Sequence, residues 1–530
     1  MIYDYIIIGA GSAGCVLANR LSANGRYNVL LLEAGPKDTN PWIHIPLGYG
    51  KLFAMPSVNW MYQSEPEAEL NGRRVFTPRG RVLGGSSSIN GLVHVRGQRE
   101  DFDEWARLGN EGWGFDDVLP YFKKSEDFQH GANAFHGAGG PLAVSDLPDK
   151  HPLCDAFISA AGEVGIPRND DFNGAQQEGA GYYHSIARNG RRASCAVAYL
   201  RPARNRPNLH VLTEALVTRI GFEGTRAATV QYEQGGTTHS VRAHQEILLC
   251  GGSFNSPQLL QLSGVGPRAL LERHGIPMVL DAPGVGEGLQ EHFYVRTVWK
   301  CARPITFNDD MRTLYGRVAT GLRYALFRRG PLTVSAGYAG AFARTRLELS
   351  RPDIQLYFIN FSTDKMGTGL HGFSGFTVSM SPLQPESRGF VRVRSADPHE
   401  APAIQYNFLS TEQDKRTVIA GLKMVRQLMS GKAIAPYVLA EHVPGLRAVT
   451  DEEWLSYACE VGGTVYHPSS TCRMGQDALA VVDERLRVRG LAGLRVVDAS
   501  IMPNVVSGNS NAAVVMIGEK AADLILAEPQ

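Results

Sequence analysis

The pattern of apolar positions at the start of the chain predicts a strand, a glycine-rich turn, a helix and a second strand. Residues 3–8 form a β-rich run, which is typical of a strand buried on both faces of a sheet. The sequence G-A-G-S-A-G occupies positions 9–14, and residues 15–21 then have helical spacing. A second buried strand is predicted at 29–32, directly before Glu33. This order is that of a βαβ unit with its glycines at the amino end of the helix.

The middle of the chain has a different pattern, in which short apolar segments alternate. Residues 354–359, 376–380 and 390–393 show this alternation, and connections containing Gly or Pro separate them, which predicts an antiparallel sheet. The far end returns to the first pattern, with a short strand at 494–497 and an amphipathic helix at 511–526. The sequence therefore predicts an α/β fold, in which a Rossmann-like domain is built from discontinuous segments and an α+β domain contains the antiparallel sheet.

The length of the chain, 530 residues, exceeds the usual limit of about 250–300 residues for a single hydrophobic core. We therefore predict two domains that share the chain. The dinucleotide-binding domain is assigned residues 1–150, 195–295 and 460–530, and the substrate-binding domain is assigned residues 151–194 and 296–459. The last of the dinucleotide-binding segments is expected to carry the catalytic residues.

Composition and charge exclude several classes of protein. A net charge of +1 argues against the broad basic surface of a nucleic-acid-binding protein. No run of 18 apolar residues and no signal peptide is found, so we expect no membrane insertion and a cytoplasmic location. The seven cysteines are scattered and contain no C-x-x-C pair, which predicts free thiols and neither a disulfide framework nor a metal site.

The glycine-rich turn is a candidate dinucleotide site. In the pattern G-x-G-x-x-G, the glycines permit a tight turn, a close approach to a pyrophosphate and close packing of helix on strand. Glu33 follows the second strand, where a carboxylate accepts hydrogen bonds from a ribose diol. The segment 284–289 lacks the third glycine and a strand–helix context, so we expect one dinucleotide only.

Several longer segments carry a family resemblance. The sequence GRVLGGSSSIN at 80–90 resembles the first signature of the glucose–methanol–choline (GMC) flavin oxidoreductases, and residues 252–266 resemble the second. The segment GVGEGLQEH at 284–292 is similar to a further family segment, with Gly288 and Glu291 as departures from the usual GVGENLQDH. Tyr-His-Pro at 466–468 and Asn-Ser-Asn at 509–511 extend the resemblance over essentially the whole chain.

This resemblance implies that the chain binds one FAD. The implied FAD contacts are Gly9, Gly11, Ser12, Ala13, Gly14, Glu33, Ala34, Gly84, Gly85, Ser86, Asn90, Gly91, Leu92, Val93, Val217, Tyr466, Asp498, Ala499, Asn509 and Ala512. Some family members attach FAD covalently through a histidine two residues after the paired serines of the first signature. Because Ile89 stands at that position, we predict non-covalent FAD.

The resemblance also implies the chemistry, which is oxidation of an alcohol by hydride transfer from its α-carbon to flavin N5. The hydroxyl proton needs a base with a pKa near the working pH, and histidine meets this need. His467 stands where the family places its base, and Asn511 stands where other members have His or Asn. The His/Asn pair resembles choline oxidases and hydroxymethylfurfural oxidases more than sugar oxidases with two histidines.

The substrate is the least specified part of the prediction. Choline-specific relatives hold the ammonium group with an acidic residue and a tryptophan-rich cage, whereas residues 304–335 contain no Glu and no Trp. Aromatic residues on the predicted antiparallel sheet suit an apolar pocket, and we assign its lining to Val465, Tyr466, Phe358 and Phe361. Uncharged primary alcohols, benzylic or furanic, fit best, and the motif spacing is closest to hydroxymethylfurfural-type and aryl-alcohol oxidases. Hydrated aldehydes would then be oxidised onward to acids.

Three hypotheses about the reaction remain open from the sequence. The first is an oxidase that passes electrons to O2 and forms hydrogen peroxide. The second is a choline-dehydrogenase-like alcohol dehydrogenase that uses a quinone or another acceptor. The third is a hydroxynitrile lyase in which FAD has a structural role. The sequence does not specify the oligomeric state.

Overall fold

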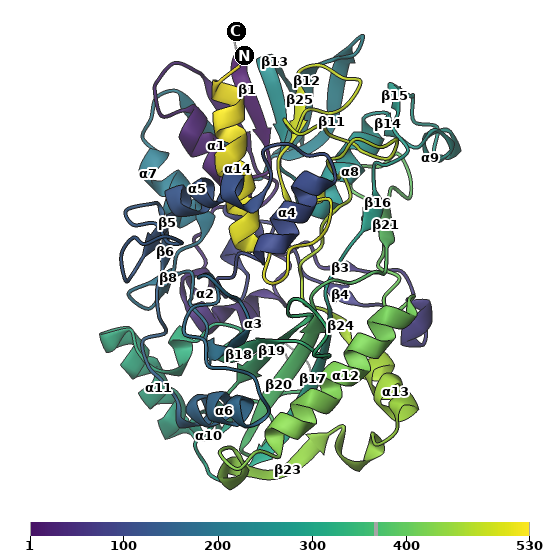
Figure 1. Ribbon diagram of the computed structural model, residues 1–530. Helices are drawn as coiled ribbons and strands as arrows, with labels where there is room; N and C mark the ends of the chain where they lie inside the picture. Colours follow the sequence, from purple (N-terminus) through teal and green to yellow (C-terminus); the bar gives the residue numbers. More distant parts are fainter. Residues whose placement is uncertain (1, 365–368, 529–530) are drawn as a thin grey trace.

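Two large sheets organise the computed structural model, which describes residues 2–364 and 369–528 (Figure 1). Within these residues, each of the two sheets contains seven strands. Both chain ends lie beside the first sheet at one end of the molecule, and the second sheet lies in the other half. The predicted combination of a Rossmann-like domain with a second domain containing a sheet is confirmed.

The first sheet is parallel around its centre and antiparallel at one side. Its strands, in spatial order, are β10 (Leu209–Leu212), β2 (Val29–Leu32), β1 (Ile2–Ile8), β13 (Thr237–Leu249), β12 (Arg226–Gln234) and β11 (Leu216–Glu223), with β25 (Leu494–Val496) also paired to β13. The pairs that join β10, β2, β1, β13 and β25 are parallel, as expected of a Rossmann-like core. Segments from the start, middle and end of the chain therefore form one sheet.

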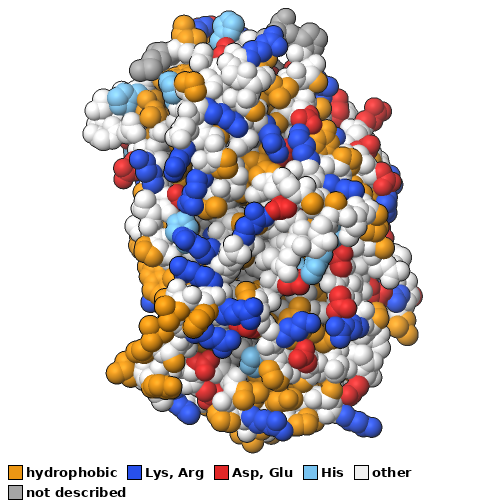
Figure 2. Space-filling model, turned by 90° about the vertical axis from the view of Figure 1, so that its left-hand side faces the viewer, with side chains coloured by type: hydrophobic (Ala, Val, Ile, Leu, Met, Phe, Trp, Pro, Cys, Tyr) orange, Lys and Arg blue, Asp and Glu red, His pale blue; other side chains and the backbone are white. Residues whose placement is uncertain are grey.

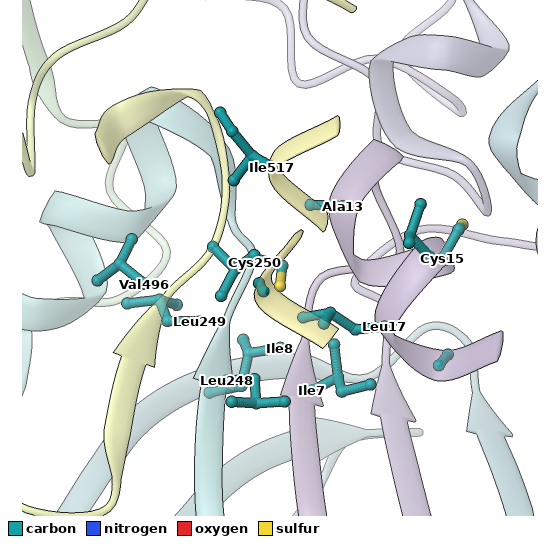
Figure 3. Packing of buried hydrophobic residues seen from close by; sticks show 14 of the residues in the cluster. Ile7, Ile8, Ala13, Cys15, Leu17, Leu248, Leu249, Cys250, Val496 and Ile517 are labelled. Carbon is teal, nitrogen blue, oxygen red and sulfur yellow. The ribbon is translucent and has the colours of Figure 1, made fainter. Parts of the chain in front are cut away.

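Two helices from opposite ends of the chain pack together on this sheet. Helix α1 (Ser12–Leu21) follows the glycine-rich turn, and α14 (Asn511–Leu526) lies beside it (Figure 1). A Cβ on Gly518 would stand 3.2 Å from the Cα of Ala13, so the small residue permits this close packing. Figure 3 shows the apolar core beneath these helices, where Ile7, Leu248 and Val496 come from three parallel strands.

The second sheet is antiparallel. Its strands, in spatial order, are β23 (Val438–Val443), β17 (Phe293–Cys301), β20 (Gly375–Pro382), β19 (Ile354–Ile359), β18 (Ala339–Ala343) and β7 (Gly179–Tyr182), with β24 (Gly463–Thr464) also paired to β17. Strand β17 crosses the domain boundary that we predicted between residues 295 and 296. The predicted strand at 390–393 is β21 (Gly389–Arg392), which lies instead in a separate three-stranded sheet with β16 (Glu287–Leu289) and β22 (Ala403–Gln405).

The two faces of the second sheet have different neighbours. Helices α6 (Pro152–Glu163) and α12 (Glu412–Met429) contribute to the core on one face, together with Leu356 and Phe358 of β19. Tyr357, between them, belongs to a separate apolar cluster on the other face. Because successive side chains of a strand point to opposite faces, the alternation seen in the sequence separates the core of this domain from the face that meets the first domain.

The remaining helices surround these sheets. They are α2 (Pro41–His44), α3 (Tyr49–Leu52), α4 (Arg99–Arg107), α5 (Phe115–Ser125), α7 (Arg201–Ala203), α8 (Gly252–Leu262), α9 (Arg268–Arg273), α10 (Phe307–Arg312), α11 (Leu314–Phe327) and α13 (Asp451–Val461). Across the described part of the chain, no helix is both long and apolar enough to cross a bilayer.

Candidate active site

A cavity of about 660 Å³ extends from the carboxyl ends of β1 and β2 to the second sheet. In open parallel sheets, ligands bind outside the carboxyl ends of the strands, so this position is the expected one. Most of the site residues predicted from the sequence line this cavity. These are Gly9, Gly11, Ser12, Ala13, Glu33, Ala34, Gly85, Ser86, Asn90, Gly91, Leu92, Val93, Val217, Val465, Tyr466, His467, Asp498, Ala499, Asn509 and Asn511.

Five predicted site residues do not line the cavity. Phe358 points to the helical face of β19 and packs on Phe157, while Phe361 packs on Phe307. The structure therefore does not bring these two aromatic rings to the site. Gly14, Gly84 and Ala512 also lie behind the cavity wall.

Two glycine turns pack against each other at the dinucleotide end of the cavity. Gly84 adopts φ +89° and donates its N–H to the carbonyl of Ala10 at 2.8 Å. A Cβ on Gly85 would lie 2.7 Å from the Cα of Gly11. A Cβ on Gly14 would lie 1.9 Å from the carbonyl oxygen of Gly9, so Gly14 maintains the packing of α1 on the turn. The backbone N–H groups of the two glycine turns, at 9–14 and 84–85, are thereby placed where a single ligand can contact both.

Glu33 is buried at the end of β2. Its carboxylate accepts hydrogen bonds from the N–H groups of Ala10 and Gly35, both at 2.9 Å. Burial raises the pKa of Glu33 to about 7, although these two backbone donors oppose the rise. The carboxylate lines the cavity beside the glycine turn, which is the position from which an acidic side chain binds a ribose diol.

His467 is presented to the cavity by a strained turn that follows β24. The preceding residue, Tyr466, has φ +76°, a conformation that is uncommon for a side chain other than glycine. The Thr464 hydroxyl accepts a hydrogen bond from the N–H of Tyr466 at 2.7 Å, and the Arg79 guanidinium donates to the Tyr466 carbonyl at 2.8 Å. These contacts hold the backbone in the conformation that turns His467 into the cavity.

A chain of hydrogen bonds assigns the proton on His467. Nε2 of His292 lies 3.0 Å from the carbonyl oxygen of Leu383, which only accepts, so Nε2 of neutral His292 carries the hydrogen and its Nδ1 has the lone pair. Nδ1 of His467 lies 3.1 Å from this Nδ1 and must donate to it. The Nε2 atom of His467 is then unprotonated and accepts from the amide nitrogen of Asn509 at 3.1 Å.

The protonation states of both histidines agree with this assignment. Burial lowers the pKa of His292 to about 4. Burial, His292 and the Arg79 guanidinium together hold the pKa of His467 well below its ordinary value. Both imidazoles are therefore neutral at neutral pH, and Nε2 of His467 is an unprotonated base whose lone pair accepts from Asn509 at the cavity.

The Glu291 carboxylate binds the backbone of both histidines. One carboxylate oxygen accepts the backbone N–H of His467 at 2.8 Å and that of His292 at 2.9 Å. Burial raises the pKa of Glu291 to about 7, against the effect of these donors and of Arg79. Glu291 and His292 belong to the motif at 284–292, but the motif itself does not predict their contacts with His467.

Asn511 lies at the start of α14 and lines the cavity. Its amide oxygen accepts a hydrogen bond from the Ser12 hydroxyl at 2.7 Å, and the amide that bonds to His467 is that of Asn509. The amide nitrogen of Asn511 is buried and has no hydrogen-bond partner among the residues that the structure describes. A buried donor of this kind is costly unless a ligand accepts from it.

Aromatic side chains form the walls around His467. Tyr49, Phe53 and Tyr466 make one group. The ring centroid of Phe53 lies 5.8 Å from that of Tyr49 and 5.2 Å from that of Tyr466. Tyr294 and Tyr357, 6.3 Å apart, make a second group with Val465. Of these aromatic residues, only Tyr466 was predicted from the sequence, because no local pattern relates Tyr49, Phe53 or Tyr294 to the site.

Comparison with known proteins identifies the family. Residues 3–294 and 385–518 match two family models, both described as GMC oxidoreductase. The chain belongs to the GMC oxidoreductase family.

Individual relatives cover the whole length of this GMC oxidoreductase. An alcohol dehydrogenase (acceptor) from Pseudomonas putida is 43% identical in an alignment 534 residues long, which covers 99% of this chain and 96% of the relative. An oxygen-dependent choline dehydrogenase from Brucella suis is 42% identical over 525 residues, 99% and 95% of the two chains. The solved structure of pyridoxine 4-oxidase from Mesorbium loti has a TM-score of 0.90 and 31% identity, covering 99% of this chain and 100% of that one.

GMC oxidoreductases bind FAD and oxidise CH–OH donors, and this enzyme has the residues for both. The paired glycine turns and Glu33 suit the pyrophosphate and ribose of a dinucleotide, and the unpartnered amide nitrogen of Asn511 suits an acceptor in the same cavity. The cavity joins these groups to His467, whose Nε2 is unprotonated and accepts from Asn509. The residues present therefore fit FAD.

Proposed function

We propose that this enzyme oxidises uncharged primary alcohols, aromatic or furanic, to aldehydes, with O2 as the electron acceptor and hydrogen peroxide as the second product. The observation that carries the proposal is the unprotonated Nε2 of His467, which opens into a cavity shared by the dinucleotide residues and by aromatic walls. Two findings support this protonation state of His467: the hydrogen-bond chain through His292, and the burial that keeps both imidazoles neutral.

The residues divide the reaction between a base and a positioning group. When the alcohol hydroxyl replaces the Asn509 amide as the hydrogen-bond donor, Nε2 of His467 takes its proton as the C–H bond of the α-carbon breaks. FAD, bound along the glycine turns, supplies the acceptor for the hydride. The amide nitrogen of Asn511 donates a hydrogen bond to an oxygen in the cavity and so aligns the alcohol. The alcohol thus loses one hydride and one proton and becomes an aldehyde.

The cavity walls favour an aromatic substrate without positive charge. Phe53, Tyr294 and Tyr357 offer flat apolar surfaces in the cavity lining, and Phe53 packs against Tyr466. Arg296 also lines the cavity, and its charge acts on both Tyr466 and Tyr294. A guanidinium at this place repels a quaternary ammonium group, so choline is disfavoured although named relatives oxidise it. The gem-diol of a hydrated aldehyde presents the same hydroxyl and C–H bond, and we propose its oxidation to the acid.

The test compares flavin bleaching with oxygen uptake for four substrates: benzyl alcohol, hydroxymethylfurfural, choline and glucose. We expect the aromatic and furanic alcohols to bleach bound FAD without oxygen and to consume O2 in air. Faster reaction with choline than with either would overturn the substrate assignment. A failure of every alcohol to bleach FAD would instead favour a hydroxynitrile lyase with structural FAD.

A second candidate is an alcohol dehydrogenase that passes electrons to a quinone or another acceptor. The relative from Pseudomonas putida, an alcohol dehydrogenase (acceptor), favours this candidate. Bleaching of FAD by alcohol without consumption of O2 in air would support it over the oxidase.

All seven cysteines are free thiols, which fits the reducing conditions of the cytoplasm that we propose as its location.

FAD is expected to be released intact when the protein is precipitated with trichloroacetic acid. Ile89 stands at the cavity wall where a histidine would be needed for a covalent link, and its side chain offers no nucleophile. The measurement is the flavin absorbance of the supernatant and of the washed pellet. A yellow pellet would show a covalent link through another residue.

Replacement of Asn511 by alanine is expected to lower kcat/KM by roughly fivefold, the effect of one lost hydrogen bond. The substitution removes the unpartnered amide nitrogen from the cavity and leaves the Ser12 hydroxyl free. Steady-state rates and FAD content would both be measured. The matched control is Asn255→Ala, a cavity-lining amide that bonds to Tyr62, and we expect it to be nearly neutral. Full activity of the Asn511 variant would remove it from the mechanism.

A further inference from the structure

Helix α11 (Leu314–Phe327) carries an exposed apolar face. Leucine or valine recurs at every fourth residue, which places these side chains in a row along the helix. The exposed apolar residues are Leu314 (77% exposed), Tyr315 (84%), Val318 (51%), Leu322 (54%), Leu326 (70%) and Phe327 (70%). Figure 2 faces the side of the molecule on which Figure 1 places α11, and hydrophobic side chains gather in its lower part with Lys and Arg nearby.

The same segment is strongly basic. Residues 312–329 contain five arginines and no Asp or Glu, in a chain whose net charge is +1. Arg323 and Arg329 share one carboxylate, that of Asp149, at 3.2 Å and 3.7 Å. Arg317 and Arg328 form no ion pair with any residue that the structure describes. Arg312 is paired with Asp309 at 3.8 Å. The five arginines therefore face two carboxylates, and the excess positive charge, that of Arg317 and Arg328 above all, is available to an anionic partner.

The inner side of α11 is fixed to the protein. Thr320 and Tyr324 are its buried residues, and the Tyr324 hydroxyl donates a hydrogen bond to the carbonyl of Gly190 at 3.2 Å. The apolar face is consequently held outward as part of the folded molecule. Large apolar side chains exposed together, and rimmed by cations, mark an interaction surface.

We propose that α11 docks this enzyme on an anionic lipid surface, lying in the plane of the membrane with its apolar row among the acyl chains and its arginines at the headgroups. Its 14 residues span about 21 Å, too short to cross a bilayer but sufficient for an interfacial helix. The pattern of Leu, Val, Tyr and Phe with flanking Arg is the one that such helices use.

Charge decides between a membrane and a second copy of this chain. In a two-fold dimer, the same surface meets itself, so the arginines of both copies would be brought together. Like charges repel across such an interface, whereas phosphate headgroups neutralise them. The anionic membrane is therefore the occupant that the charges favour.

The inference goes beyond the proposed oxidation and concerns where the enzyme acts. After α11, the chain passes through η5 (Pro331–Thr333) to Ala336, which lines the cavity. The proposed docking helix and a wall of the active site thus belong to one short stretch of chain. An enzyme docked in this way meets alcohols and electron acceptors that dissolve in lipid.

The experiment is co-sedimentation of the FAD-loaded enzyme with vesicles. Phosphatidylcholine vesicles containing about 30 mol% phosphatidylglycerol provide the anionic surface, and pure phosphatidylcholine vesicles are the control. We expect binding to the anionic vesicles that weakens as salt is raised. Leu322→Gln/Leu326→Gln should weaken binding by roughly tenfold per leucine, and Arg317→Gln/Arg328→Asn by roughly fivefold per charge.

Matched variants separate docking from general hydrophobicity. Leu347 (88% exposed) and Leu446 (97% exposed) lie outside α11, and Leu347→Gln/Leu446→Gln should bind vesicles as the wild type does. Oxidation of a soluble alcohol should be unchanged in all variants, which shows that they fold and keep FAD. No binding to anionic vesicles, or binding that the α11 variants do not weaken, would overturn the proposal. So would a dimer in size-exclusion chromatography that Leu322→Gln/Leu326→Gln converts to a monomer.

Discussion

Replacement of His467 by alanine is expected to slow the reduction of bound FAD by an alcohol by about 10²- to 10⁴-fold, the usual effect of losing a general base. Nε2 of His467 is the base that the hydrogen-bond chain leaves unprotonated in the cavity. Alanine removes it and leaves the hydroxyl proton without an acceptor. The measurement is anaerobic stopped-flow absorbance of the flavin at saturating alcohol.

The control for this variant is His399→Ala. His399 lines the same cavity but is exposed and paired with Glu233 at 3.1 Å. We expect nearly normal reduction in that variant and normal FAD content in both. Reduction of FAD by the His467 variant at close to the wild-type rate would assign the base to another group.

The wild-type rate should also have a defined dependence on pH. Neutral His467 is the active form, and burial with nearby positive charge lowers its pKa well below the ordinary value of about 6.5. The imidazole therefore stays unprotonated through neutral pH, and its protonation begins only in more acidic solution. Flavin reduction is expected to be flat near pH 7 and to fall on the acid side of 6.5.

The dinucleotide half of the site could be predicted because its signals are local. The strand, the glycine turn and helix α1 follow one another within the first 21 residues, and the backbone leaves no room for a Cβ at Gly9 or Gly14. The start of α14 at Asn511 was likewise readable from helical spacing. In these segments the neighbours in space are also neighbours in sequence, or are fixed by a recurrent motif.

The substrate half could not be predicted in the same way. The alternation along β19 separated Tyr357 from Phe358, but no property of that strand says which face meets the first domain. Phe358 was assigned to the pocket, and Tyr357 lines the cavity instead. Tyr49 and Phe53 reach the same cavity from a different segment, so their role depends on how the two sheets meet.

The strongest further test of the site concerns His292, which touches no cavity surface but sets the tautomer of His467. Replacement by leucine is expected to lower the flavin-reduction rate by roughly tenfold, because Nδ1–H of His467 loses its acceptor and the Nε2–H tautomer becomes populated. His292→Asn should recover most of the rate, since the asparagine oxygen can accept from Nδ1. Both variants would be compared with the wild type by anaerobic stopped flow.

The dependence of the His292→Leu rate on pH distinguishes a tautomer effect from an effect on ionisation. Both tautomers of His467 are neutral, so their ratio does not change with pH, and the plateau of the profile should fall at every pH above the acid limb. A change in the pKa of His467 alone would move the acid limb and leave the plateau height intact. Both variants remove the Nε2–H donor to the Leu383 carbonyl. The loss of stability from leaving that buried carbonyl without a donor is therefore the same in both. An asparagine variant as slow as the leucine variant would therefore show that His292 acts through packing and not through the hydrogen bond to His467.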